Sequence, residues 1–182
     1  MRKVIFAINL TINGSANHTS GIVDDELHDF YTDWFDNVDV ILFGRKTYQL
    51  MESFWPVARK NSRSTKSILR FADKINSVSK IVVSKTLTEV DWNNSQIFKG
   101  NIKDEISRLK KEKGKSISIG GLSLASYLTS QGLIDEYWFL VHPIFSDNSK
   151  NLFQNLIKPV QLKLIDIQKL KSGVVVSHYH KL

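Results

Sequence analysis

Residues 117–124 read ISIGGLSL, a short β-prone run that ends in two glycines and continues into an apolar helical pattern. Residues 40–48, VILFGRKTY, repeat this order of strand, glycine and helix. A glycine at such a junction lets another group approach the backbone closely, and the helix behind it offers free N–H groups and its positive dipole end. Arg45 and Thr47 add hydrogen-bond donors suited to phosphate. Each junction alone is more often a simple turn, but the two together, in these surroundings, form a more specific pattern.

The rest of the chain alternates between β-prone runs and helical patterns, which favours an α/β fold. Apolar residues spaced three and four apart predict helices near residues 27–34, 68–75 and 102–109, and further helices follow the two glycine junctions. The β-prone runs predict strands over residues 3–10, 38–43, 80–84, 96–99, 116–119, 136–145, 161–170 and 174–180.

Capping and turn signals mark several ends of these elements. Asp24 or Asp25 is placed to cap the first helix. Gly114 and Gly132 occupy the position preferred just after a helix. Lys-Ser-Gly at 171–173 predicts a hairpin turn between the last two strands.

The composition is that of an ordinary globular domain. The chain has 182 residues, of which 42% are hydrophobic and 24% charged, so we expect one domain over residues 1–182. Cysteine is absent, which excludes disulfides, thiolate nucleophiles and cysteine-ligated metal sites. No apolar run reaches the ~20 residues of a membrane-spanning helix. Asn9 and Asn13 interrupt the N-terminal apolar stretch before a signal-peptide core could form, so we expect a cytoplasmic protein with no membrane partner.

Other classes of site are weaker interpretations of this sequence. The formal net charge is +7, but the basic stretches 59–70 and 110–115 lack the interleaved aromatic residues of a nucleic-acid stacking platform. We therefore expect no nucleic-acid partner. His178 and His180 alternate on a predicted strand and share a face, the minimum for a metal pair, but no third ligand is near in sequence. We expect no metal site.

Taken together, the motifs resemble the dihydrofolate-reductase-like superfamily. Within it, the chain is similar to the family of the reductase domain of the bifunctional riboflavin-biosynthesis enzyme. The resemblance is carried, in order, by FGRKTY at 43–48, VVSKTL at 82–87, IGGLSL at 119–124, LIDEY at 133–137, HPI at 142–144 and SGVVVSHY at 172–179. It implies a single α/β domain whose central mixed, mostly parallel sheet is flanked by helices and ends in an antiparallel C-terminal hairpin.

The resemblance also implies NADPH as cofactor, lying across the ends of the strands. The cofactor-binding residues would be Ala7, Ile8, Gly44, Arg45, Lys46, Thr47, Ser84, Lys85, Gly120, Gly121, Leu122, Ser123 and Leu124. Asn9 and Phe30 would contact the substrate. Glu26 would be the catalytic acid, although a carboxylate in the first helical turn can equally serve only to complement the helix dipole. The family often has an SLDG-like run where this chain has TING at 11–14, and Asn13 cannot deliver a proton readily.

The expected function is an NADPH-dependent reductase that transfers a hydride to a small heterocyclic substrate. Pterin-like or ribosylaminopyrimidine-like compounds are the substrates that the resemblance implies, and it leaves a role in riboflavin biosynthesis open. We also expect a homodimer built partly from the C-terminal strands, where residues 174–176 are an apolar Val run. The alternative is a non-catalytic dinucleotide-binding or sensor module.

Overall fold

Eight β-prone runs form one sheet in the computed structural model, which describes residues 1–146, 152–153, 156 and 158–182. The strands lie in the order β4-β3-β2-β5-β1-β6-β8-β7 across the sheet. Their bounds are β1 (Val4–Thr11), β2 (Val38–Gly44), β3 (Ser79–Val83), β4 (Ser95–Phe98), β5 (Ser116–Gly120), β6 (Glu136–His142), β7 (Leu162–Lys169) and β8 (Val175–Lys181).

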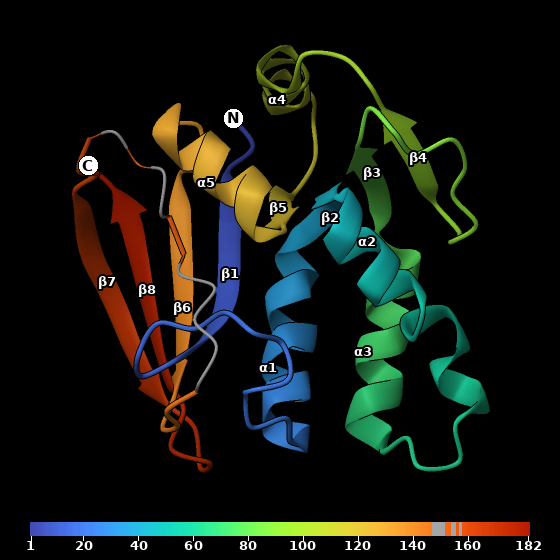
Figure 1. Ribbon diagram of the computed structural model, residues 1–182, viewed down its shortest axis with the longest axis vertical. Coiled ribbons are helices and arrows are strands. Elements are labelled where there is room, and N and C mark those ends of the chain that lie inside the picture. The colour runs from blue at the N-terminus through green and yellow to red at the C-terminus, as the bar shows by residue number, and fades with distance from the viewer. Residues whose placement is uncertain (147–151, 154–155, 157) are drawn as a thin grey trace.

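Strands β1 to β6 pair with one another in parallel, whereas β8 is antiparallel to both β6 and β7. Figure 1 shows β6, β8 and β7 side by side at one edge of the molecule. The predicted mixed, mostly parallel sheet with an antiparallel C-terminal hairpin is therefore confirmed. The strand predicted over 136–145 ends earlier, at His142, because Pro143 has no N–H for the ladder.

The α-helices also follow the predicted pattern. They are α1 (Asp25–Trp34), α2 (Arg45–Glu52), α3 (Lys66–Ser77), α4 (Ile102–Lys111) and α5 (Leu122–Ser130), with short 3-10 helices η1 (Phe35–Asn37) and η2 (Trp55–Lys60). Asp24 caps α1 by accepting a hydrogen bond from the Leu27 N–H, as expected. None of the helices that the structure describes has the length and apolar character needed to cross a bilayer.

The prediction that Gly114 closes the helix over 102–109 is wrong. Helix α4 ends at Lys111, and its C-cap is Glu112 in an extended conformation. Gly114 instead lies in the turn that leads into β5, where a Cβ would be 3.0 Å from the Arg2 guanidinium carbon and would collide with the Asp39 carboxylate. Glycine at position 114 therefore lets this turn pack closely against Arg2 and Asp39.

The helices cover both faces of the sheet, and apolar core lies between helices and sheet on each face. On one face, apolar residues of α4 and α5 such as Ile106 and Leu128 pack against Phe6 of β1. On the other, Tyr48 of α2 and Ile75 of α3 join the second core, and Figure 1 shows α1 and α3 lying alongside each other. The helices that follow the neighbouring strands β2 and β5 thus lie on opposite faces. In parallel α/β sheets, ligands bind outside the carboxyl ends of the strands where the winding reverses in this way.

Candidate cofactor and substrate site

The two strand–glycine–helix junctions meet at this reversal point. Phe43 of β2 is opposite Gly120 of β5 in the parallel register. A Cβ on Gly44 would lie 3.9 Å from the Gly120 carbonyl oxygen, and one on Gly121 would lie 2.9 Å from the Thr47 hydroxyl. The sequence separates these glycines widely, but the fold makes them neighbours.

The glycines of the second junction have specific structural reasons. Gly121 has φ +120°, a conformation that residues with side chains rarely adopt. A side chain at Gly120 would collide with the Phe43 ring. At Gly44 the backbone is ordinary, with φ −72° and ψ 148°, so glycine is not required there by its dihedral angles.

Helices α2 and α5 begin without a capping side chain among the described residues. Gly44 and Gly121 are their N-caps, and neither first turn contains an acidic residue. The other α-helices begin at capping side chains, namely Asp24, Thr65 and Asn101. Two sets of free N–H groups, each at the positive end of a helix dipole, therefore lie at the same edge of the sheet. Such an arrangement binds anions.

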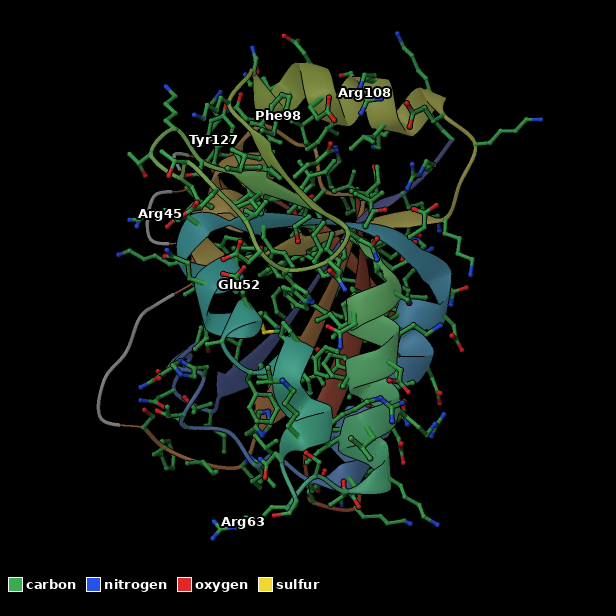
Figure 2. All side chains as sticks on the ribbon, turned by 90° about the vertical axis from the view of Figure 1, so that its right-hand side faces the viewer. Arg45, Glu52, Arg63, Phe98, Arg108 and Tyr127 are labelled. Carbon is green, nitrogen blue, oxygen red and sulfur yellow. The ribbon has the colours of Figure 1, made fainter. Side chains whose placement is uncertain are left out.

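Basic residues increase the positive potential at the start of α2. Arg45 and Lys46 occupy its first turn, where their charges are unfavourable with the helix dipole. Both side chains are exposed, and Figure 2 shows Arg45 projecting away from the ribbon. Within the described part of the chain, no carboxylate lies within ion-pair distance of either. A bound phosphate would offset this unfavourable placement.

Ser84 and Lys85 come directly after β3, beside the start of α2. Gly44 pairs with Val83, the last residue of β3, so the loop that follows reaches the same edge. The buried Ser84 hydroxyl oxygen accepts hydrogen bonds from the N–H groups of Thr86 and Leu87 at 3.3 and 3.0 Å. This fixes the loop and leaves the exposed Lys85 side chain at its surface.

The remaining expected cofactor contacts come from α5 and β1. Leu122, Ser123 and Leu124 form the first turn of α5, and Ser123 is exposed. Ala7 and Ile8 are half-buried on β1, which lies between β5 and β6. Ala7 faces the core beside α1, and Ile8 faces the core beside α5. The fold therefore brings all four segments of the expected cofactor site to the carboxyl half of the parallel strands.

A polar group that the sequence did not reveal lies at the end of β1. The Nδ1 of buried His142 accepts a hydrogen bond from the Ile22 N–H at 2.9 Å. The ring proton is therefore on Nε2, which donates a hydrogen bond to Asn9 Oδ1 at 3.1 Å. Burial raises the pKa of the Tyr31 hydroxyl, and hydrogen bonding with Asn9 partly offsets this effect. The pKa of His142 is lowered by burial, against the attraction of Asp24. Both groups therefore stay neutral at neutral pH.

Tyr31 and His142 were not predicted as site residues. Tyr31 belongs to the apolar stripe of α1, which predicts a core position. His142 precedes Pro143 in a β-prone run, a position where a histidine is more often structural than catalytic. The available signal was the alternation along β1, which places Asn9 on the same face as Ile5 and Ala7, toward α1.

The structure does not bring Glu26 to the glycine junctions. Its Oε2 accepts a hydrogen bond from the Lys171 N–H at 2.7 Å, at the turn between β7 and β8. With Phe30 it lines a cleft of about 650 Å³ between α1 and the C-terminal strands, which extends to Lys3 and Glu136 at the amino ends of the strands. None of the expected cofactor-binding residues lines this cleft. The acid role of Glu26 stays a prediction.

Comparisons with known proteins agree with this architecture. A family model described as the RibD C-terminal domain matches residues 2–176. The uncharacterized protein YyaP of Bacillus subtilis (strain 168) is 31% identical, over 98% of this chain and 95% of that protein. A putative riboflavin biosynthesis protein from Shewanella sp. PV-4 has a TM-score of 0.74 at 18% identity, with 99% of each chain covered. Dihydrofolate reductase from Enterococcus faecalis, solved with NADP(H), has a TM-score of 0.63 at 12% identity over 98% of this chain and 96% of that chain. The last two likenesses show the fold.

Proposed function

Because the chain belongs to the RibD C-terminal domain family, we propose that it is an NADPH-dependent reductase. In this proposal it transfers a hydride to a C=N or carbonyl carbon of a small heterocycle, pterin-like or ribosylaminopyrimidine-like. The fold is that of dihydrofolate reductase and of riboflavin-biosynthesis proteins, and the dihydrofolate reductase neighbour was solved with NADP(H).

The observation that carries the proposal is the meeting of two uncapped helix N-termini at Gly44 and Gly121. A dinucleotide brings a pyrophosphate, which two such N-termini are suited to hold. Arg45, Lys46 and Lys85 provide further positive charge along the same edge, which suits the additional 2′-phosphate of NADPH. The residues present therefore fit the cofactor, and its nicotinamide supplies the hydride when bound.

The chain's own contribution is to bind, orient and shield the reacting groups. Ala7, on the same face of β1 as Asn9, provides an apolar contact for the nicotinamide at the middle of the sheet, and Ile8 borders it from the opposite face. Asn9 and Tyr31 present polar groups next to the nicotinamide. The hydrogen bond from the single His142 tautomer holds Asn9, which in turn is hydrogen-bonded with Tyr31. Because burial keeps the Tyr31 hydroxyl protonated, this group can donate a hydrogen bond to a substrate nitrogen or oxygen but is a poor proton donor.

The test is substrate-dependent oxidation of NADPH over a panel of pterins, ribosylaminopyrimidines and simple carbonyl compounds. We expect oxidation with one of the two heterocycle classes and loss of that activity in Asn9→Ala at unchanged affinity for NADPH. If no panel compound stimulates NADPH oxidation, the reductase proposal is contradicted.

A second candidate, a non-catalytic dinucleotide-binding module, is favoured by one observation. The expected acid, Glu26, is hydrogen-bonded to the Lys171 backbone and lines a cleft that the residues of the glycine junctions do not line. Calorimetric binding of NADPH together with no turnover of any panel member would favour this module. Absence of NADPH binding would exclude both candidates.

A further inference from the structure

Two neighbouring strands of the sheet, β6 and β8, bring together a carboxylate and two imidazoles. Glu136 of β6 lies directly opposite His180 of β8, and His178 is opposite Trp138. Successive side chains on a strand alternate between faces, so Glu136, Trp138, His178 and His180 all share the face toward α1. The sequence shows His178 and His180 as a pair without a third partner. Glu136, 42 residues before His178, is that partner.

The polar atoms of the three side chains lie close together. Nε2 of His178 lies 3.1 Å from Glu136 Oε2, and Nε2 of His180 lies 3.2 Å from Glu136 Oε1. One ligand atom from each residue can be chosen so that all lie within 4.8 Å of one another. Ligand atoms about 2.0–2.1 Å from a tetrahedral Zn²⁺ are about 3.3 Å apart, so small side-chain movements suffice. The geometry points to a binding site for a divalent first-row transition ion, with Glu136, His178 and His180 as its protein ligands.

The site is rigid and largely removed from water. The side chains of Glu136 and His178 are only 10% and 13% exposed, while His180 is 39% exposed. The Trp138 ring stacks on the His178 imidazole, with centroids 3.8 Å apart and planes 11° from parallel. This stacking fixes the ring orientation from which His178 Nε2 points at Glu136. Little side-chain ordering would then be needed when a metal binds.

The donor atoms select the class of metal. Two imidazole nitrogens and one carboxylate oxygen suit Zn²⁺ and neighbouring transition ions, whereas Mg²⁺ and Ca²⁺ prefer oxygen ligands alone. Three protein ligands leave a tetrahedral position open. Glu136 borders both the 650 Å³ cleft and a smaller one of about 220 Å³, which His180 also lines. Water or a small anionic ligand could reach the open position from these clefts.

Lys3 competes with the metal for Glu136. Its ammonium group is paired with Glu136 Oε1, the oxygen nearest His180. The Lys3 side chain is 55% exposed, so it can turn into solvent when an ion binds. A Lys3→Met change removes the competing charge while keeping the apolar stem of the side chain. Lys3→Met is therefore expected to raise the affinity for the metal, whereas changes to the three ligand residues are expected to lower it.

The experiment is calorimetric titration of tag-free protein with Zn²⁺, because a histidine tag would itself bind the ion. We expect one Zn²⁺ per chain, with affinity reduced at least about tenfold in His180→Gln and Glu136→Gln, since even indirect partners of a metal site change affinity by 10–100-fold. Lys3→Met should raise the affinity several-fold. His18→Gln is the matched control, because it removes an exposed histidine outside the cluster and should change nothing.

Melting temperatures without metal check that each variant folds. If Glu136→Gln does not fold, His180→Gln still tests the site, because the His180 side chain is more exposed. Substitution by Co²⁺ adds a spectroscopic readout, since a tetrahedral site gives intense visible absorption that His180→Gln should abolish. No saturable Zn²⁺ uptake, or equal affinities in wild type, His180→Gln and His18→Gln, would overturn the site. None of these measurements depends on reductase activity.

Discussion

His142 donates a hydrogen bond from Nε2 to Asn9 Oδ1 at 3.1 Å, while its Nδ1 accepts from the Ile22 N–H at 2.9 Å. Protonation of Nδ1 would therefore replace an acceptor by a second donor facing an N–H group. The ring is also fully buried, and burial lowers its pKa. One neutral tautomer thus links β6 to β1 and to the loop before α1.

This linkage makes stability depend on pH. The unfolded chain binds a proton at His142 as pH falls through about 6.5, whereas the folded chain does so only at lower pH. Stability contributed by neutral His142 is therefore present above pH 6.5 and is lost as pH falls below it, by about 1.4 kcal/mol for each unit of pKa depression. Urea unfolding at pH 7.0 and 5.5 should show a smaller loss in His142→Gln than in wild type. Equal losses would contradict the assignment.

Gly44→Ala and Gly121→Ala form a matched pair for the cofactor site. Gly44 has ordinary backbone angles, and its added Cβ would make normal contacts of 3.9–4.0 Å. We expect Gly44→Ala to lower stability by less than about 1 kcal/mol and to weaken NADPH binding about tenfold or more, because the methyl group occupies the approach of a phosphate. Thermal melting and calorimetry measure the two effects separately. Unchanged affinity in folded Gly44→Ala would place the phosphates elsewhere.

The other member of the pair, Gly121, differs from Gly44 in its backbone angles. Gly121→Ala would cost little stability if the backbone angles suited alanine. However, φ at Gly121 is +120°, and the added Cβ would lie 2.9 Å from the Thr47 hydroxyl. Gly121→Ala is therefore expected to lower stability by about 1 kcal/mol or more as well as weaken NADPH binding. A melting temperature equal to that of wild type would contradict this expectation.

The fold was predictable because its signals are local. Strand, glycine and helix follow one another within nine residues at 40–48, and parallel strands place both such junctions at one edge. Contacts across the sheet were not predictable, because nothing local fixes which strands are neighbours. Glu136 meets His178 only through the β6–β8 register, and Glu26 meets Lys171 across 145 residues of chain. The same limitation concealed the pairing of Asn9 with His142.

Arg45 is expected to distinguish NADPH from NADH. Its side chain is exposed and, among the described residues, has no carboxylate partner, so its removal should not affect folding. We expect wild type to bind NADPH more tightly than NADH in calorimetric titrations, and Arg45→Gln to weaken NADPH binding about tenfold through loss of a charged hydrogen bond. Equal affinities of wild type for the two cofactors would contradict this prediction.

Lys80 should give a second pH dependence, at alkaline pH. Its ammonium group is fully buried above the Trp92 ring and donates hydrogen bonds to the carbonyl oxygens of Asn76, Val78 and Asn93. Burial lowers the pKa of Lys80 from 10.5 to about 8. Between these values the unfolded chain binds more protons than the folded one, so stability rises with pH, by about 1–2 kcal/mol between pH 7.5 and 9.5. Lys80→Met should lose this rise in urea unfolding. A rise of equal size in the variant would assign it to other groups.

The outer edge of the sheet predicts a homodimer. Strand β7 has no partner on its outer side among the described residues, and Leu164, Ile167 and Val175 expose 46%, 58% and 39% of their surface. The β7–β8 register places these three on the face opposite the Glu136–His178–His180 cluster, so a second copy could cover them without covering that cluster.

Light scattering at micromolar concentration should give about twice the chain mass of 20.8 kDa. Ile167→Lys should give a monomer, whereas Ile12→Lys, a control that changes an isoleucine of similar exposure in the turn after β1, should stay dimeric. A wild-type mass near 20.8 kDa would instead mean that β7 stays uncovered in solution.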